Sequence, residues 1–217
     1  MVGELPRCSG NKIFLVMNKV LNGGNKGEDM EFTFILYLEG EERFSASSPY
    51  RACELVQKRV QEYLKEKRPS SGPESFIKYN ADDDLEKYEN EVRTYKRLEP
   101  FALCPRLLDH GYYEFRCKHD EEEFVLYGYY IETELFGVSL HQEYPQLVSC
   151  APGSTSLQAV EDIDDYFDYP EEVNQKIKKV LDRMHELGVV HHDMHGGNLL
   201  IKNGEIRVID FELVELE

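Results

Sequence analysis

The hydrophobic and polar positions along the chain follow two periods, which predict a mixture of strands and helices. Runs rich in β-branched and aromatic residues predict strands at 12–20, 31–38, 76–79, 104–115 and 122–135, with a polar loop at 116–121. Apolar residues at helical spacing predict three helices, at 50–67, 82–98 and 170–187. Either Ser47 or Ser48 is expected to cap the first helix, and Gly188 to end the last one.

The chain ends in two further strand-like segments, LLIK at 199–202 and IRVID at 206–210. Asn203 and Gly204 lie between them, and an Asn-Gly pair is a strong signal for a two-residue hairpin turn. The hairpin is expected to carry Asp210 back beside Asn198, which directly precedes its first strand.

Asp193, Asn198 and Asp210 form a constellation that suits magnesium-assisted chemistry on a phosphate. Asp193 lies five positions before Asn198, and Gly196 and Gly197 allow the backbone to turn tightly between them. Mg²⁺ prefers oxygen ligands and completes its shell with the phosphates of a nucleotide. One of the two carboxylates then remains to orient or deprotonate a hydroxyl group.

These residues also carry a family resemblance. HHDMHGGN followed by IDFE resembles the catalytic loop and the metal-binding motif of the protein-kinase-like superfamily, H-x-D-x-x-x-x-N and D-F-G. The resemblance implies that Asp193 is the catalytic base and that Asn198 and Asp210 are the metal ligands. It gives His191 a structural role in supporting the loop.

Within that superfamily the loop is most similar to the form found in aminoglycoside- and choline-kinase-like enzymes. His195 stands where protein kinases usually have lysine, and Glu212 replaces the last glycine of D-F-G. Both departures fit the H-x-D-x-H-x-x-N and D-F-E variants. The resemblance places His195 near the transferred phosphate.

The superfamily pairs a lysine on a strand with a glutamate on the following helix, and this pair orients the lysine towards the nucleotide phosphates. Lys78 and Glu91 match the two places. Glu89 is a neighbouring alternative for the glutamate. Without the resemblance, Lys78 is an ordinary solvent-facing strand residue and Glu91 one of many helix acids.

The segment YYIETELFG resembles the hinge between the two kinase lobes, where the backbone pairs with adenine. Thr133, Glu134 and Leu135 are candidates for this contact by position. Residues 22–28 contain three glycines but lack the G-x-G-x-x-G spacing of a loop that covers ATP. An ordinary hairpin loop is the preferred interpretation there.

The composition of the chain disfavours several classes of binding partner and location. The formal net charge of -17 disfavours nucleic acid and anionic membranes, because phosphate contacts need clustered basic residues. Five scattered cysteines without C-x-x-C spacing indicate thiols rather than disulfides or zinc. No apolar run approaches transmembrane length, and a cytoplasmic or nuclear protein is expected.

The fold expected from the resemblance is a two-lobed α+β protein-kinase-like fold. An antiparallel-sheet N-lobe at 1–133 would join a reduced helical C-lobe at 134–217, which ends seven residues after Asp210. The expected function is ATP- and Mg²⁺-dependent phosphorylation of a hydroxyl on a protein or small molecule. The short C-lobe fits a minimal or truncated kinase, or a kinase whose C-lobe is completed by a partner protein. The alternative is an inactive pseudokinase-like interaction module that still binds nucleotide.

Overall fold

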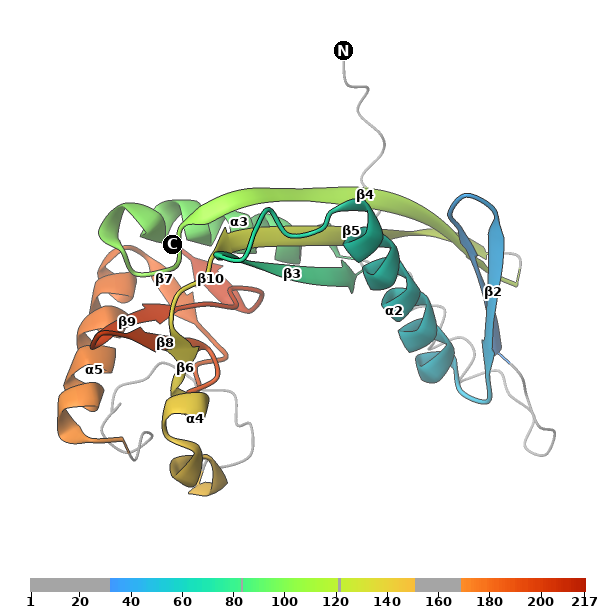
Figure 1. Ribbon diagram of the computed structural model, residues 1–217. Coiled ribbons are helices and arrows are strands. Elements are labelled where there is room, and N and C mark those ends of the chain that lie inside the picture. The colour runs from blue at the N-terminus through green and yellow to red at the C-terminus, as the bar shows by residue number, and fades with distance from the viewer. Residues whose placement is uncertain (1–31, 83, 121, 151–168) are drawn as a thin grey trace, which may run out of the picture. The chain divides into compact units, whose positions relative to one another are not determined.

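The computed structural model describes residues 32–82, 84–120, 122–150 and 169–217 (Figure 1). These residues form two compact units. Unit 1 contains the described residues up to Ser70 together with Ile77–Leu85 and His110–Tyr130, and unit 2 contains Ser71–Phe76, Glu86–Asp109 and Ile131–Glu217. The units are therefore discontinuous in sequence, and the division into lobes at residue 133 stays a prediction.

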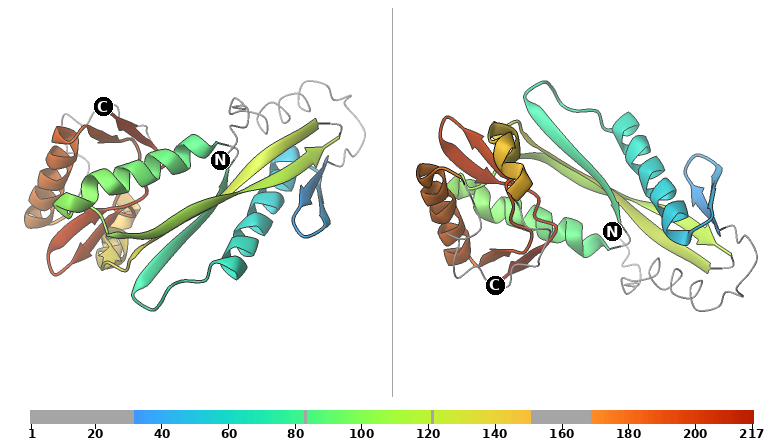
Figure 2. Two further views of the ribbon diagram at one scale, coloured as in Figure 1. Left: turned by 90° about the horizontal axis from the view of Figure 1, so that it is seen from above. Right: turned by 90° about the horizontal axis from the view of Figure 1, so that it is seen from below.

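A five-stranded sheet has the strand order β2-β1-β4-β5-β3 (Figures 1 and 2). Its strands are β1 (Phe32–Tyr37), β2 (Glu41–Ala46), β3 (Ser75–Asp82), β4 (Leu107–His119) and β5 (Glu122–Glu134). β1 is antiparallel to both β2 and β4. The sheet and the helices described below make an α+β fold, as expected. The predicted strand at 12–20 and the glycine-containing segment at 22–28 lie outside the described residues.

The predicted loop at 116–121 is wrong over most of its length. β4 continues to His119, and buried side chains alternate with more exposed ones at Phe115, Cys117 and His119. This period of two is the signature of a half-buried strand. It is hidden in the sequence because Arg116, Lys118 and His119 are polar. β2 was not predicted, since its polar composition conceals the same alternation.

The core of unit 1 lies between the sheet and helix α2 (Pro49–Lys67). α2 contacts β1 and β2, and it buries one apolar face formed by Ala52, Cys53, Val56, Val60 and Leu64. Ser48 caps this helix by accepting a hydrogen bond from the Arg51 N–H at 3.5 Å. The structure thus selects Ser48 from the two predicted caps.

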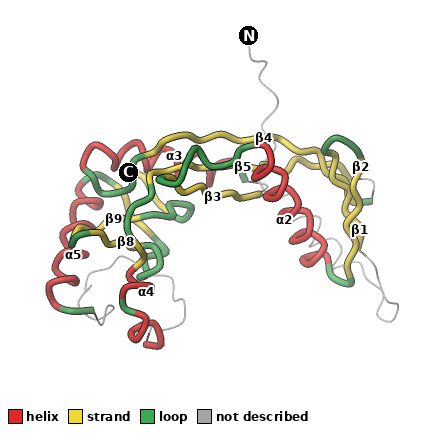
Figure 3. The backbone as a smooth tube through the Cα atoms, in the orientation of Figure 1, coloured by secondary structure: helices red, strands yellow, loops and turns green. Residues whose placement is uncertain are grey.

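Unit 2 contains most of the remaining elements. Its helices are α3 (Leu85–Leu98, of which Leu85 belongs to unit 1), α4 (Leu140–Glu143) and α5 (Glu171–Glu186), with 3-10 turns at Glu99–Phe101 and Pro145–Cys150. Its short strands are β6 (Val138–Ser139), β7 (Val189–His191), β8 (Leu199–Lys202), β9 (Glu205–Val208) and β10 (Val214–Leu216). Irregular loops join β7 to β8 and β9 to β10 (Figure 3).

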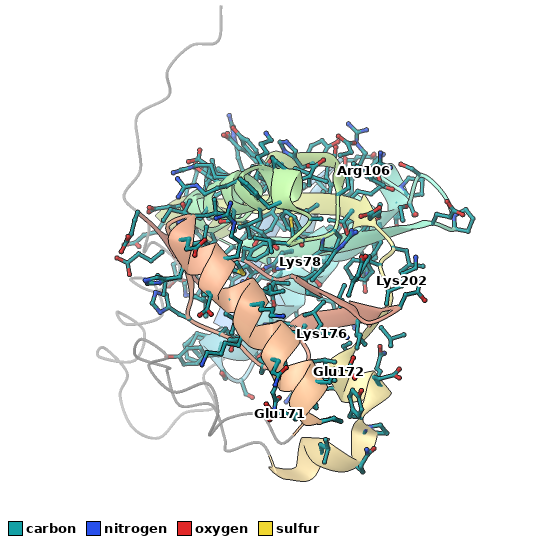
Figure 4. The ribbon with its side chains drawn as sticks, turned by 90° about the vertical axis from the view of Figure 1, so that its left-hand side faces the viewer. Lys78, Arg106, Glu171, Glu172, Lys176 and Lys202 are labelled. Atoms are coloured by element: carbon teal, nitrogen blue, oxygen red, sulfur yellow. The ribbon has the colours of Figure 1, made fainter. Side chains whose placement is uncertain are left out.

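α5 is anchored at its C-terminal end by an arginine from α3. Gly188 follows the helix with φ +66°, the left-handed conformation that ends helices without a Cβ penalty. The Arg97 guanidinium donates hydrogen bonds of 3.1 Å to the carbonyls of Leu187, Gly188 and Glu217. Near the start of α5, the Lys176 ammonium donates a hydrogen bond of 2.9 Å to the Glu172 carboxylate (Figure 4). The predicted helix and its stop at Gly188 are confirmed.

The predicted hairpin at the end of the chain is also confirmed. β8 and β9 are antiparallel, and Asn203 and Gly204 have φ of +53° and +80°. Two consecutive positive φ values define the type I′ turn that Asn-Gly favours. β6 adds a third strand by pairing with β8. Gly137 precedes β6 with φ +56°, and a Cβ there would lie 2.1 Å from the Ile201 carbonyl oxygen.

In the described parts of the chain, Cys53, Cys104 and Cys117 are buried thiols that form no disulfide. Burial raises the pKa of the Cys104 and Cys117 thiols to about 12. None of the helices in the described parts has the length and apolar composition of a membrane span.

Candidate active site

The loop after β7 and the segment after β9 are hydrogen-bonded to each other within unit 2. The Asn198 side-chain amide donates to the Asp193 carbonyl oxygen at 2.9 Å, and the Ile209 N–H donates to the Asn198 carbonyl oxygen at 3.0 Å. Asp210 follows Ile209 directly. The structure therefore brings together the three residues Asp193, Asn198 and Asp210, because the β8–β9 hairpin returns the chain to the start of β8.

The Asp193 carboxylate is half-exposed and has two neighbours. The Asn198 Nδ2 lies 3.5 Å from its Oδ2 atom, and the His195 Nε2 lies 3.6 Å from the same oxygen. Among the residues that the structure describes, both contacts of this carboxylate thus go to Oδ2. A carboxylate held through one oxygen can accept a proton or a hydrogen bond at the other.

His191 is buried beneath this loop and links it to the segment after β9. Its Nδ1 accepts a hydrogen bond from the Asp193 N–H at 3.2 Å, so its Nε2 carries the proton and donates to the Ile209 carbonyl at 3.3 Å. The Phe211 ring packs edge-on at 5.7 Å. Burial lowers the pKa of His191 and favours the neutral ring that both hydrogen bonds require. These contacts suit the structural role that the resemblance implies.

Asp210 has φ +67°, a left-handed conformation that is uncommon for residues other than glycine. Strained backbone of this kind is often kept at functional sites. Glu91, Asp210 and Glu212 each place one carboxylate oxygen within 4.8 Å of the others, and Glu91 is fully buried. Carboxylates this close repel one another unless a cation lies among them. Hard oxygen ligands of this type suit Mg²⁺.

Tyr95 is buried beside Asp210 and near this cluster. The Tyr95 ring packs edge-on against Phe211, with ring centroids 4.9 Å apart. Burial raises the pKa of Tyr95 well above its ordinary value, and the negative charge of Glu91 raises this pKa further. A tyrosine that stays neutral beside carboxylates does not add negative charge to them.

The other predicted site residues are divided between the two units. Lys78 is half-buried on β3 in unit 1, whereas Glu91 belongs to unit 2, and their pairing stays a prediction. Thr133 is buried in β5, and the Leu135 side chain is exposed. The Leu135 N–H donates to the Glu74 carbonyl at 2.8 Å, so this predicted adenine contact would have to displace a hydrogen bond within the protein.

Two residues that the sequence did not indicate pack against the glycines of the loop. The His141 N–H donates to the Gly196 carbonyl at 3.2 Å, and a Cβ on Gly196 would lie 1.9 Å from the Tyr169 hydroxyl. Neither Gly196 nor Gly197 has a positive φ, so close approach rather than backbone conformation requires glycine. No local signal marks His141 or Tyr169, because both contacts span long sequence separations.

Known proteins resemble parts of this chain. Residues 155–214 match the family model described as "Lipopolysaccharide core biosynthesis protein (WaaY)". The chain is 38% identical over 61 residues to the lipopolysaccharide core heptose(II) kinase WaaY of Escherichia coli strain K12, which corresponds to 26% of each chain. It is 25% identical over 150 residues to a probable SapB synthase of Streptomyces coelicolor, covering 69% of this chain and 14% of that protein.

Among solved structures, the bifunctional kinase-methyltransferase WbdD aligns with a TM-score of 0.42 and 16% identity, over 67% of this chain and 29% of that one. The chain thus spans about a quarter or less of the curated relatives that it matches. The match to WaaY includes the catalytic-loop motif and the segment around Asp210. The kinase motifs and the WaaY matches fall in the same part of the chain, and this part is similar to the protein-kinase-like superfamily.

Proposed function

We propose that the protein transfers the γ-phosphate of ATP, with Mg²⁺, to a hydroxyl group of a small molecule, and that sugars are the first acceptors to test. The observation that carries the proposal is the hydrogen-bonded arrangement that holds Asp193 and Asn198 beside the segment of Asp210. The partial match to a heptose kinase supports a sugar acceptor rather than a protein.

In this proposal Asn198 and Asp210 bind Mg²⁺, and Asp193 orients the acceptor hydroxyl. Asp193 suits this role because its half-exposed carboxylate is contacted at Oδ2 alone among the described residues. The metal would neutralise charge on the transferred phosphoryl group, and positioning would supply most of the remaining rate.

The nucleotide contacts are proposed for Lys78, Glu91, Thr133, Leu135 and His195. Lys78 would hold the α- and β-phosphates, with Glu91 orienting it, and His195 would lie near the transferred phosphate. The cluster of Glu91, Asp210 and Glu212 supports a cation at this place, which either Mg²⁺ or a lysine ammonium would supply.

A second candidate is a non-catalytic interaction module of the same superfamily. The observation that favours it is the hydrogen bond from the Leu135 N–H to the Glu74 carbonyl, which occupies a donor that adenine would use. Such a module would bind partners without transferring phosphate.

The experiment incubates the purified protein with γ-labelled ATP and Mg²⁺, separately with a pool of sugars, a pool of other small hydroxyl compounds and a pool of proteins. We expect label on a sugar-type acceptor, and about 10²–10⁴-fold slower labelling with Asp193→Ala. Label on proteins alone would overturn the acceptor class. A rise of melting temperature with ATP but no transfer to any pool would favour the interaction module.

A further inference from the structure

His141 and His195 form a stacked pair beside Asp193, although the two histidines come from separate parts of unit 2. Their ring planes are 12° apart, and the ring centroids are separated by 5.6 Å. These values describe offset parallel stacking, which stabilises aromatic pairs beyond their buried area. His141 lies on α4 and His195 lies in the loop after β7. Stacking therefore restrains a ring that is otherwise half-exposed.

The position of the proton on His195 is fixed by the backbone of its own loop. The Gly197 N–H donates a hydrogen bond to His195 Nδ1 at 3.0 Å. An imidazole nitrogen that accepts a hydrogen bond carries no proton, so the proton of His195 is on Nε2. The Nε2 atom lies 3.6 Å from Asp193 Oδ2, slightly beyond hydrogen-bond distance, and the Nε2–H dipole attracts the carboxylate.

The glycines of the loop make room for this arrangement. A Cβ on Gly197 would lie 2.7 Å from His195 Cε1, and a Cβ on Gly196 would lie 2.7 Å from His141 Cδ2. Real Cβ atoms essentially never show contacts this short. Both rings therefore rest directly on the glycine backbone, where a side chain on either glycine would displace them.

We propose that His141 and His195 act together as positioning residues for Asp193, with His141 holding the His195 ring so that its Nε2–H fixes Asp193 Oδ2 and leaves Oδ1 to the acceptor hydroxyl. The inference rests on the proposed function, because it assigns Asp193 to the acceptor. It adds His141, a residue outside the catalytic-loop motif, to the residues that set the rate of transfer. His141 acts only through His195 and does not touch the substrate.

The test uses His141, because His195 is also proposed to lie near the transferred phosphate. His141→Ala removes the stacking ring, whereas His141→Phe keeps a flat ring without its nitrogens. We expect His141→Ala to lower kcat by about tenfold with an unchanged KM for ATP, and His141→Phe to stay within about threefold of wild type, since a well-placed supporting group is worth one order of magnitude or more. His185→Ala, an exposed histidine on α5, is the control expected to match wild type.

Coupling provides a second kinetic readout. In a His195→Ala background, His141→Ala should lower kcat no further, because residues that act through one another are not additive. Equal losses for His141→Ala and His141→Phe, an altered KM for ATP, or additive losses in the double variant would each overturn the proposal.

A readout without turnover separates this inference from the proposed function. Long-range ¹H–¹⁵N NMR spectra of the imidazole rings distinguish the two neutral tautomers. Wild type and His141→Phe should show His195 with its proton on Nε2, and His141→Ala should show averaged signals from a mobile ring. A wild-type His195 with its proton on Nδ1 would overturn the inference, even if phosphate transfer is found. A fixed Nε2–H tautomer lost in His141→Ala would support it, even if the acceptor is still unidentified.

Discussion

The core of unit 1 and the proposed catalytic loop of unit 2, which follows β7, are held in place by different forces. In unit 1, α2 and the sheet bury apolar side chains such as Val60 and Leu126, which are fully inaccessible to solvent. In the loop of unit 2, hydrogen bonds to backbone groups and close packing on glycines fix Asp193, His195 and Asn198. The core of unit 1 depends on the apolar area that it buries and on the volume that its side chains fill. The loop depends on individual donor and acceptor atoms.

This difference predicts which substitutions each region tolerates. Apolar packing accepts residues of similar size, because the hydrophobic effect has no direction. A loop held by specific donors and acceptors loses its geometry when one of them is removed, even where little stability is lost. Stability and activity should therefore separate between the two regions.

The largest effect is expected for Asp193→Ala. A positioned base contributes about 10²–10⁴-fold in rate, so phosphate transfer should fall by that factor. The rise in melting temperature with ATP and Mg²⁺ should remain, because Asp193 is neither of the two proposed metal ligands. Rate assays and thermal shifts on the same preparation test both parts. Asp182→Ala, which changes an exposed aspartate on α5, serves as the control. If Asp193→Ala is as active as this control, Asp193 is not part of the site.

Leu126→Ala should have the opposite effect, with a loss of stability and no loss of activity. Removing a fully buried leucine costs about 2–5 kcal/mol of the free energy of unfolding through lost burial and the cavity left behind. Well below the melting temperature, its kcat should equal that of wild type. Denaturant unfolding measures the first quantity, with Leu55→Ala on the exposed side of α2 as the matched control. A loss of kcat in the folded variant would show that the two regions are not independent.

Asp210→Asn should remove the metal-dependent part of nucleotide binding. A ligand at about 100 times its Kd stabilises the folded state by about 2.7 kcal/mol, and the share due to Mg²⁺ should disappear with the carboxylate. Melting temperatures with ATP alone and with ATP plus Mg²⁺ give this share by difference. Asp182→Asn is the control. If Asp210→Asn keeps the full magnesium-dependent shift, Asp210 is not a metal ligand.

The smallest effect concerns the cap of α2. Ser48→Ala should destabilise unit 1 by about 1 kcal/mol, because the Ser48 hydroxyl accepts the Arg51 N–H at the start of the helix. Ser47→Ala, which changes the exposed neighbour, should stay within about 0.5 kcal/mol of wild type. Denaturant unfolding of both variants decides between the two serines, and a larger loss for Ser47→Ala would contradict the assignment.

Much of the fold was predictable because local patterns determine local elements. α2, α3 and α5 follow apolar residues at helical spacing, and the β8–β9 hairpin follows its Asn-Gly turn. The prediction failed where polar side chains alternate on a strand. Residues 116–119 and β2 are strands because sheet pairing and burial of one face outweigh their polar composition.

The sequence by itself determined the order of the motif residues and the return of Asp210 to Asn198, since a two-residue turn fixes the register of its hairpin. Only the tertiary structure decided that His141 stacks on His195 and that Glu91 joins Asp210 and Glu212. The physical reason is sequence separation. Contacts between distant segments depend on how whole elements pack, and no local pattern of residues encodes that packing.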